Sequence, residues 1–436
     1  MKKQFTFTKI QNMMKVFKKK GVYIMKFTKF KSGFFLLIAV MLLLVGCSSS
    51  DGGEGNITKD GKVKLRFATW DVGDDVTLQQ NMIDKFNKSH DDIKVVLESY
   101  GSEYDTKITA GMGAKDAPDI MYMWNYPQYK DALEPLDSYL EKEGAEYKDN
   151  FYETLWNYNS ADDQILGLPV GYTTHVVYYN KALFDEAGVD YPKSGWSWED
   201  LQDTAKKIAN NDSKVSGFAF SGKPDPYDFE MFLWSNGTSY VDADGNLKDN
   251  LNSEQSIEVF DMFQNMAKDG YAITTEGSGT TEMKSGKVAM FVYGAWGLTP
   301  LKEAGIDYGV VELPTFKNGK SVSILSSSGI SISKNSKHKD EAFEFIKFWT
   351  NEESNKERIG FELPVLKSVV ESEQLEQDEL KSVFYTMLEQ SDGYTPASFI
   401  VEDWSKVSED LNYTFESMLN PSTLMDPKEA LNSAVE

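Results

Sequence analysis

The first pattern in the chain is a run of apolar residues, FFLLIAVMLLLVGC, which spans residues 34–47 and ends at the only cysteine, Cys47. Three lysines precede the run, and it is shorter than the roughly 20 residues that a membrane-spanning helix needs. A basic segment before a short apolar stretch is typical of a secretory signal. We therefore expect residues 1–46 to be a signal peptide and exclude them from the fold. Residues 1–24 add a second basic segment ahead of Met25, which a start codon assigned too early would explain.

Cys47 stands at the border between this apolar run and polar sequence. The tetrapeptide Leu44-Val45-Gly46-Cys47 resembles the lipobox of bacterial lipoproteins, which implies that Cys47 is acylated and becomes the first residue of the mature protein. The alternatives are a buried thiol and a short membrane anchor. The next residues, SSSDGGEGN, are small and polar, so we expect residues 47–60 to include a flexible tether between the lipid and a folded body.

Beyond residue 60 the pattern changes to alternating and helical periods. Residues 62–67 alternate polar and apolar side chains and predict a strand. Leu78, Met82 and Phe86 then recur at four-residue spacing, which predicts a helix, and residues 92–97 again indicate a strand. This β-α-β order favours an α/β architecture with parallel strands.

Aromatic and polar residues follow two of the predicted strands. Trp70 and Asp71 come after the first strand, and Trp124 and Asn125 end the apolar segment that begins at residue 117. Ligands of open α/β sheets bind beyond the carboxyl ends of the strands. These four residues are therefore candidates for a binding site.

Two later segments predict a strand and a helix. The tyrosine-rich run VVYYNK, residues 176–181, follows GLPVGYT and indicates a strand that crosses between two domains. Further along, Ser197 is a suitable N-cap for a helix that places Leu201, Ala205 and Ile208 on one face.

Composition limits the partners. The whole chain has 45 basic and 68 acidic residues, a net charge of −23. Residues 1–47 hold ten lysines and no acidic residue, so their removal leaves 35 basic and 68 acidic residues, a net charge of −33. So acidic a protein is a poor partner for nucleic acid. No cysteine follows Cys47, so the body relies on apolar cores, and its length favours two of them.

The order of several segments between residues 62 and 410 resembles the extracellular solute-binding proteins of ATP-driven sugar importers, the family that includes maltose-binding protein. The segments that carry the resemblance are APDI, LEPLDSYL, GLPVGYTTHVVYYNKALFDEAG, WSWEDL, MKSGKVAMFVYGAWGL, YGVVELPTF, SSSGISISKNSKHKDEAFEFIKFWT and FELPVLKS. The lipoprotein signal agrees with the Gram-positive members, which are anchored at the outer face of the cell membrane beside their permease.

The resemblance implies a two-lobed periplasmic-binding-protein-like fold of type II, with two discontinuous α/β domains joined by hinge strands. We expect residues 61–170 and 315–352 to form the first lobe, and residues 171–314 and 353–436 to form the second. The predicted crossings lie near residues 168–174, 311–316 and 351–354. Such lobes close around a ligand by hinge motion.

Sugar binding calls for aromatic platforms against the apolar face of the ring, and for amides and carboxylates around its hydroxyl groups. The candidate ligand-binding residues are Trp70, Asp71, Trp124, Asn125, Tyr172, Tyr227, Trp234, Trp296, Glu362, Asp403 and Trp404. The resemblance implies that Trp296, Tyr227, Trp124 with Asn125, and Trp404 are the family's stacking positions. Thr173 stands where the maltose-binding pattern has a glutamate, which argues against maltose itself.

Other chemistries find less support. The three histidines are scattered, no nucleophile or phosphate-loop motif is present, and Asp242-Ala243-Asp244-Gly245-Asn246 lacks the final glutamate of a calcium loop, so we expect a turn there and no metal or cofactor. We expect a monomeric, non-catalytic lipoprotein that binds a mono- or oligosaccharide and delivers it to the permease of an ABC transporter. A lipid-anchored carbohydrate-active enzyme and a binding protein for a non-sugar solute remain as alternatives.

Overall fold

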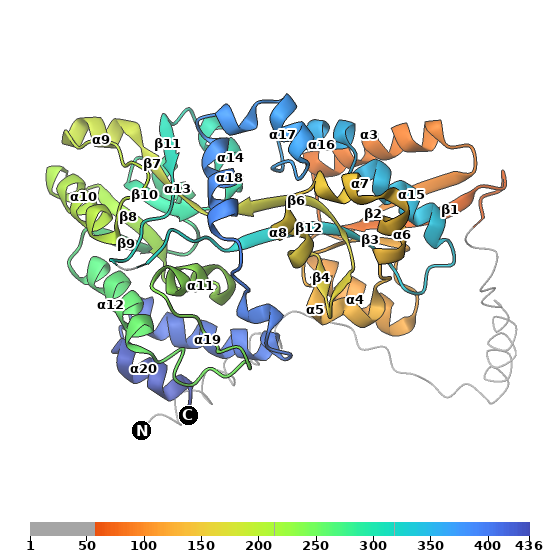
Figure 1. Cartoon of the computed structure of the whole chain (residues 1–436). Helices are drawn as coiled ribbons and strands as arrows, with labels where there is room; N and C mark the ends of the chain where they lie inside the picture. The colour runs from red at the N-terminus through yellow and green to blue at the C-terminus, as the bar shows by residue number, and fades with distance from the viewer. Residues whose placement is uncertain (1–56, 213, 318) are drawn as a thin grey trace, which may run out of the picture. The chain divides into compact units, whose positions relative to one another are not determined.

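The computed structural model describes residues 57–436 apart from residues 213 and 318. The predicted signal peptide, Cys47 and all but the last four residues of segment 47–60 lie outside these residues. Within the described part of the chain, no helix is long and apolar enough to cross a membrane. Two five-stranded sheets organise this part, and each has helices packed against it (Figure 1). We call each sheet with its helices a lobe.

The first sheet has the strand order β2-β1-β3-β12-β6. Its strands are β1 (Val63–Thr69), β2 (Ile93–Ser99), β3 (Ile120–Met123), β6 (Leu168–Thr174) and β12 (Leu325–Ile332). β1 pairs in parallel with β2 and β3, whereas β12 runs antiparallel to both β3 and β6. The predicted β-α-β start is confirmed, because α3 (Asp74–Ser89) connects β1 to β2 and buries Met82 and Phe86.

Aromatic side chains fill the core between this sheet and its helices. Trp349, in α15 (Lys339–Trp349), is fully buried and its indole N–H donates to Tyr122 Oη at 3.0 Å. The ring of Phe67 packs edge-on against Trp349, with 5.0 Å between the ring centroids. This packing fixes the carboxyl ends of β1 and β3, after which Trp70 and Trp124 follow. The other helices beside this sheet include α4 (Tyr104–Ala114), α5 (Tyr126–Tyr129), α6 (Asp137–Glu143), α7 (Ala145–Asp149) and α8 (Glu153–Tyr158).

The second sheet has the order β11-β7-β10-β8-β9. Its strands are β7 (Val176–Asn180), β8 (Ser216–Ser221), β9 (Ala272–Thr275), β10 (Val288–Tyr293) and β11 (Tyr308–Val311). The helices of this lobe include α9 (Lys181–Ala187), α10 (Trp198–Asn211), α11 (Pro226–Ser235), α12 (Glu254–Lys268), α13 (Thr280–Lys284), α14 (Leu298–Glu303), α19 (Trp404–Leu419) and α20 (Pro427–Ala434).

The predicted start of α10 is confirmed. Ser197 forms a capping box with Asp200, in which each side chain accepts a hydrogen bond from the other residue's backbone N–H. Leu201, Ala205 and Ile208 are all buried, as the four-residue spacing predicted.

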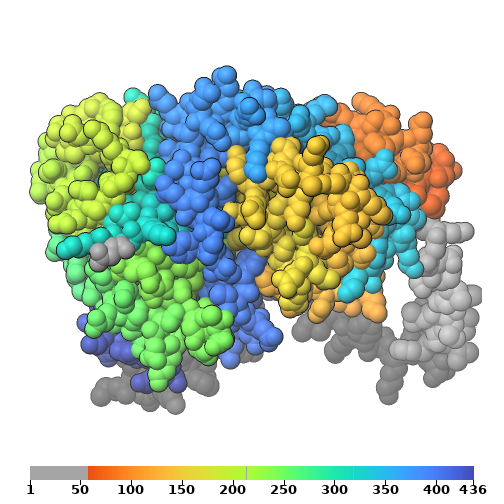
Figure 2. Space-filling model, viewed as in Figure 1, coloured from red at the N-terminus to blue at the C-terminus, as the bar shows by residue number. Residues whose placement is uncertain are grey.

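Three segments connect the lobes, and hydrogen bonds join them to one another. His175 lies between β6 and β7, and its backbone N–H donates to Ser323 Oγ at 2.6 Å in the segment between β11 and β12. The N–H of Ser323 in turn donates to Ser391 Oγ at 2.8 Å, just after α18 (Lys381–Gln390). Figure 2 shows the blue segment that contains α18 between the two lobes on the viewed face.

The third connection begins later in the chain than the sequence indicated. Residues 353–436 were assigned to the second lobe, but α16 (Glu352–Arg358) and α17 (Lys367–Ser372) lie on the first lobe. The N–H of Lys367 donates to Asn150 O at 2.7 Å, and the guanidinium of Arg358 donates to Trp349 O at 2.7 Å. These contacts join segments far apart in the sequence, which local patterns do not reveal. β6 also stays in the first sheet as far as Thr174, beyond the predicted boundary at residue 170.

Candidate functional site

A cavity of about 400 Å³ opens where the first lobe faces Ala295 and Trp296 of the second lobe. Its first-lobe walls come from the carboxyl ends of β1 and β3, from β6 and β12 near the crossing, and from the loop after α16. Both lobes thus contribute to one site.

Three large aromatic side chains are exposed at this cavity. Trp124 is 45%, Phe361 48% and Trp296 50% exposed. Trp70 is half-buried, and Tyr104 and Tyr122 support its ring with centroids at 5.2 and 5.1 Å. Exposed rings gathered at one cavity indicate a binding surface for a ligand with flat apolar faces.

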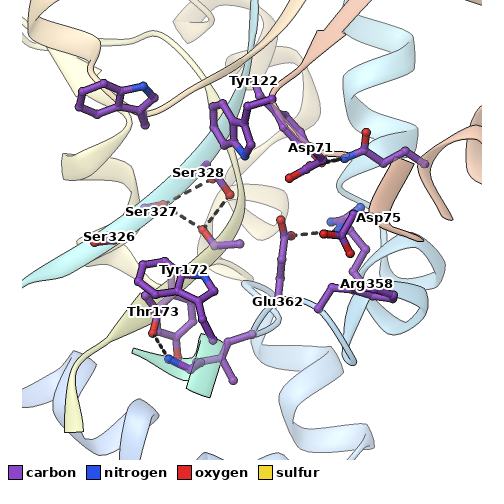
Figure 3. Close-up of a pocket in the computed structure, with 18 of the residues that line it drawn as sticks. Asp71, Asp75, Tyr122, Tyr172, Thr173, Ser326, Ser327, Ser328, Arg358 and Glu362 are labelled. Carbon is purple, nitrogen blue, oxygen red and sulfur yellow. Dashed lines mark hydrogen bonds and ion pairs between the residues drawn. The ribbon is translucent and has the colours of Figure 1, made fainter. Parts of the chain in front are cut away.

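Carboxylates gather on one side of the same cavity (Figure 3). Asp71 Oδ2 accepts hydrogen bonds from Gln79 Nε2 at 2.6 Å and from Thr69 Oγ1 at 3.0 Å. Burial nevertheless raises the pKa of Asp71, and burial with the charges of Asp71 and Asp74 raises the pKa of Asp75. Asp71 Oδ1 and the carboxylate of Asp75 remain as acceptors for a ligand in the cavity.

Glu362 and Arg358 form a pair beside these carboxylates. Arg358 Nε lies 3.3 Å from Glu362 Oε2, but neither atom makes a hydrogen bond within the described part of the chain. About a quarter of the Glu362 side chain is exposed, whereas Oε2 itself is buried, and this burial raises the pKa of Glu362 to about 7. The exposed part of the Glu362 side chain is what a ligand hydroxyl group in the cavity could contact.

Small residues form the floor of the cavity. Ser327 Oγ donates to Gly171 O at 3.2 Å, and β12 has an irregular register at Ser328 and Gly329, beside the cavity. A Cβ atom on Gly171 would lie 2.6 Å from Glu362 Oε2, so only glycine permits this approach of strand and carboxylate. Serine hydroxyl groups here add further donors and acceptors.

The structure brings six of the eleven predicted ligand-binding residues to this cavity: Trp70, Asp71, Trp124, Tyr172, Trp296 and Glu362. Tyr172 is 5% exposed, and its ring packs edge-on against Tyr385 at 5.8 Å. Among the six, Trp296 alone comes from the second lobe.

The other five predicted residues lie elsewhere. Asn125 caps α5, Asp403 precedes α19, and both lie with Trp404 in a separate cavity of about 700 Å³. Trp234 is 5% exposed and packs on Tyr394, with ring centroids at 5.4 Å. Tyr227 is half-buried, and its hydroxyl group donates to Leu325 O at 2.6 Å. The end of a predicted strand brought Asn125 into the candidate set, and the resemblance ranked Tyr227 and Trp404, but neither signal determines which cavity a side chain faces.

Sequence reasoning missed several residues that line the cavity: Asp75, Gln79, Ser326, Ser327, Ser328, Arg358 and Phe361. Arg358 is one of only two arginines in the chain and stands three residues before the FELP segment that was already noted. The rarity of arginine in this chain, together with the nearby Phe361, was the available signal. The serines and Gln79 carry no comparable signal.

No three His, Cys, Asp or Glu side chains of the described residues are arranged to hold a metal ion. The segment that begins at Asp242 is a turn, as predicted, because Asp242 Oδ1 accepts from the N–H groups of Asp244 and Asn246 at 2.9 Å.

Two α/β lobes around one aromatic and carboxylate-lined cavity define a binding protein of the two-lobed class. A family model described as "Bacterial extracellular solute-binding protein" matches residues 81–382, and the chain belongs to this family. The predicted fold class is confirmed by solved structures of two-lobed binding proteins. The family is one of extracellular binding proteins.

Three similar proteins illustrate the relationship. The galactooligosaccharide-binding protein of Bacillus subtilis is 26% identical over 428 residues, which cover 94% of this chain and 97% of that protein. A Brucella abortus chain named as a binding protein is 28% identical over 340 residues, 73% of this chain and 77% of its own. The ABC substrate-binding protein from Listeria monocytogenes in complex with cycloalternan is 25% identical, with a TM-score of 0.73 over 86% of this chain and 97% of that chain.

Proposed function

We propose that this protein binds a sugar, most simply an oligosaccharide, in the cavity between its lobes and delivers it to the permease of an ABC transporter. The observation that carries this proposal is the set of exposed rings from both lobes, Trp124 and Phe361 on the first and Trp296 on the second. A ligand gains differential affinity for the closed form only if both lobes contact it. The relatives named for galactooligosaccharide and bound to cycloalternan support a carbohydrate ligand.

The polar groups of the cavity suit hydroxyl groups. Three carboxylates, on Asp71, Asp75 and Glu362, accept hydrogen bonds, and the serines of β12 both donate and accept. A sugar has apolar faces and a rim of hydroxyl groups, so the same ligand can use the aromatic rings and the carboxylates.

A phosphorylated ligand is the second candidate, because relatives named for sn-glycerol 3-phosphate are 28% identical over 251 residues. Among the described residues that line the cavity, Arg358 is the only basic one. Its side chain is 4% exposed, donates to Trp349 O and Val170 O, and is paired with Glu362. A guanidinium that already donates to backbone carbonyl groups, beside the carboxylates of Asp71 and Asp75, disfavours an anion. A neutral sugar therefore fits better.

We also propose that the protein performs no catalysis. The alternative, a carbohydrate-active enzyme, would use paired carboxylates on either side of a glycosidic bond. In this cavity Asp71, Asp75 and Glu362 lie together on one side, as Figure 3 shows. Carboxylates on one side of a sugar bind its hydroxyl groups and do not flank the bond to be cleaved.

The proposal extends to the location of the protein. The lipobox-like segment that ends at Cys47 supports a lipid anchor at the outer face of a Gram-positive cell membrane, where the protein, as a monomer, docks on its permease. Tethering raises the concentration of the binding protein near the transporter. Membrane contact would then run through the lipid.

A thermal-shift screen of the purified protein against neutral oligosaccharides, glycerol 3-phosphate and inorganic phosphate tests the ligand class. A saturable rise in melting temperature with an oligosaccharide, and none with either anion, is expected. A shift with glycerol 3-phosphate alone would overturn the sugar proposal. Release of reducing ends from the oligosaccharide at catalytic turnover would overturn the proposal that the protein only binds.

A further inference from the structure

A second pocket, of about 270 Å³, lies in the second lobe at the carboxyl ends of β8 and β10. The start of α11 and residues 276–278 complete its wall. Parallel β8 and β10 end side by side here, at the position where open α/β sheets bind their ligands. The cavity described above lies on the other side of Trp296 and shares no lining residue with this pocket.

The inner wall of this pocket is aromatic. Phe218, Phe220, Phe229, Phe232 and Phe263 line it, and none of them is more than 8% exposed. An apolar cavity of about 150 Å³ already admits benzene. The larger pocket thus has room and a suitable lining for one aromatic ring with a substituent.

The rim of the pocket is polar and carries excess negative charge. Asp225, Asp228 and Glu276 lie at the rim, and its one basic residue among those described, Lys223, is paired with Glu416 at 3.0 Å. His175 also lines the pocket and is 3% exposed, and its Nδ1 has no hydrogen-bond partner within the described part of the chain. The acidic rim repels an anionic ring but does not repel a neutral one.

Trp296 connects the pocket to the candidate sugar site. Its ring lies 5.7 Å from that of Tyr293 and 6.3 Å from that of His175, centroid to centroid, and both of these residues line the pocket. A sugar stacked on Trp296 would therefore have one end near the pocket.

We propose that this pocket binds an uncharged aromatic ring, carried as the aglycone of a sugar ligand that stacks on Trp296. The lining of the pocket alone supports binding of an aromatic ring. The attachment of that ring to a sugar rests on the proposed function. The ligand class inferred is thus an aryl glycoside with a neutral ring.

Saturation-transfer NMR with phenol, benzoate and cyclohexanol tests the pocket without any sugar. Phenol should bind saturably, with benzoate and cyclohexanol at least about tenfold weaker, because the rim disfavours an anion and the wall stacks best on a flat ring. Ser221→Phe places a ring at the half-buried end of β8 inside the pocket, and Val292→Phe does the same from β10. Both variants should lower phenol affinity at least about tenfold, whereas Ser221→Thr should not.

A second experiment tests the connection to the sugar site. Phenyl glycosides of the sugar identified in the thermal-shift screen should bind at least about tenfold more tightly than methyl glycosides, and Ser221→Phe should abolish this preference while methyl glycoside binding is retained. The proposed aromatic-ring site would be overturned if phenol showed no saturable binding. It would also be overturned if phenol bound unchanged to both Ser221→Phe and Val292→Phe. Equal affinity for phenyl and methyl glycosides would overturn the aglycone proposal and leave sugar binding intact.

Discussion

Thr173 and Ala295 are joined between the lobes by a hydrogen bond of 2.7 Å, which the backbone N–H of Ala295 donates to Thr173 Oγ1. Thr173 lies in β6, three residues before the chain enters the second sheet at Val176, and Ala295 immediately precedes Trp296. A Cβ atom on Gly294 would lie 2.9 Å from both Thr173 Oγ1 and the Trp296 ring, so the three residues pack closely. The strand at the crossing therefore positions the ring that faces the cavity.

Removal of the Thr173 hydroxyl group should weaken ligand binding. In Thr173→Val the N–H of Ala295 loses its acceptor, and the segment that carries Trp296 is held less firmly. We expect a loss of about 1 kcal/mol, or roughly fivefold in Kd, measured by isothermal titration. Thr173→Ser keeps the hydroxyl group and serves as the matched control. Equal affinities of the two variants would show that the bond does not position Trp296.

Replacement of Trp296 by alanine should lower sugar affinity and leave stability unchanged. Half of this side chain is exposed, so it contributes little to the core and is available to a ligand. The expected loss of affinity is on the order of 1 to 3 kcal/mol. Titration of the purified variant measures it, and unchanged affinity would remove Trp296 from the site.

Trp234 provides the matched comparison for Trp296. It is 5% exposed and packs on Tyr394, so Trp234→Ala should cost about 3 to 5 kcal/mol of the free energy of unfolding. Chemical denaturation reports this loss. If Trp234→Ala proved as stable as the wild type, the buried position assigned to this residue would be incorrect.

Glu362 should make stability depend on pH. Its pKa is raised from 4.5 to about 7, so between these values the folded state binds a proton that the unfolded state has released. Stability from this group is therefore present at low pH and is lost as the pH rises through about 7. Glu362→Gln keeps the shape of the protonated side chain and should remove this dependence.

The comparison of the two proteins by urea unfolding at pH 5 and pH 8 measures the effect. The wild type should lose about 2 to 3 kcal/mol more than Glu362→Gln over this interval, since each pKa unit corresponds to about 1.4 kcal/mol. All other titrating groups are common to both proteins and cancel. Parallel pH profiles would mean that Glu362 does not hold its proton in the folded state.

Replacement of Cys47 by serine should release the protein from the membrane or leave its signal unprocessed. The lipobox-like sequence offers one residue for acylation, and a serine cannot form the thioether. Fractionation of cells that express the two forms gives the answer, with the wild type in the membrane fraction. Retention of the serine variant in that fraction, with a processed signal, would contradict lipidation at this position.

Local patterns in the sequence were sufficient for the elements and for part of the site. The alternation of residues 62–67 and the spacing of Met82 and Phe86 depend on burial within one strand or one helix, and both were predicted correctly. Trp70 and Trp124 were found because they follow strands, and the carboxyl ends of parallel strands meet at one edge of a sheet.

The remaining site residues depend on contacts that no local pattern encodes. Arg358 reaches the cavity because α16 returns to the first lobe and donates to Trp349 O and Val170 O, so its position follows from long-range packing. The same return explains why the last crossing comes after α17 and not near residue 352. Trp234 was selected as an aromatic candidate, but packing against Tyr394 buries it.

The hydrogen bonds that join His175, Ser323 and Ser391 have a mechanical consequence. Because these bonds couple the three connections, we expect the connections to move together when the lobes rotate. Probe pairs placed across the lobes should therefore report a displacement that grows in proportion to their distance from these residues. If the lobes do turn together in this way, the angle between them reports whether a ligand is bound, and a partner that contacts both lobes would sense that angle without touching the ligand.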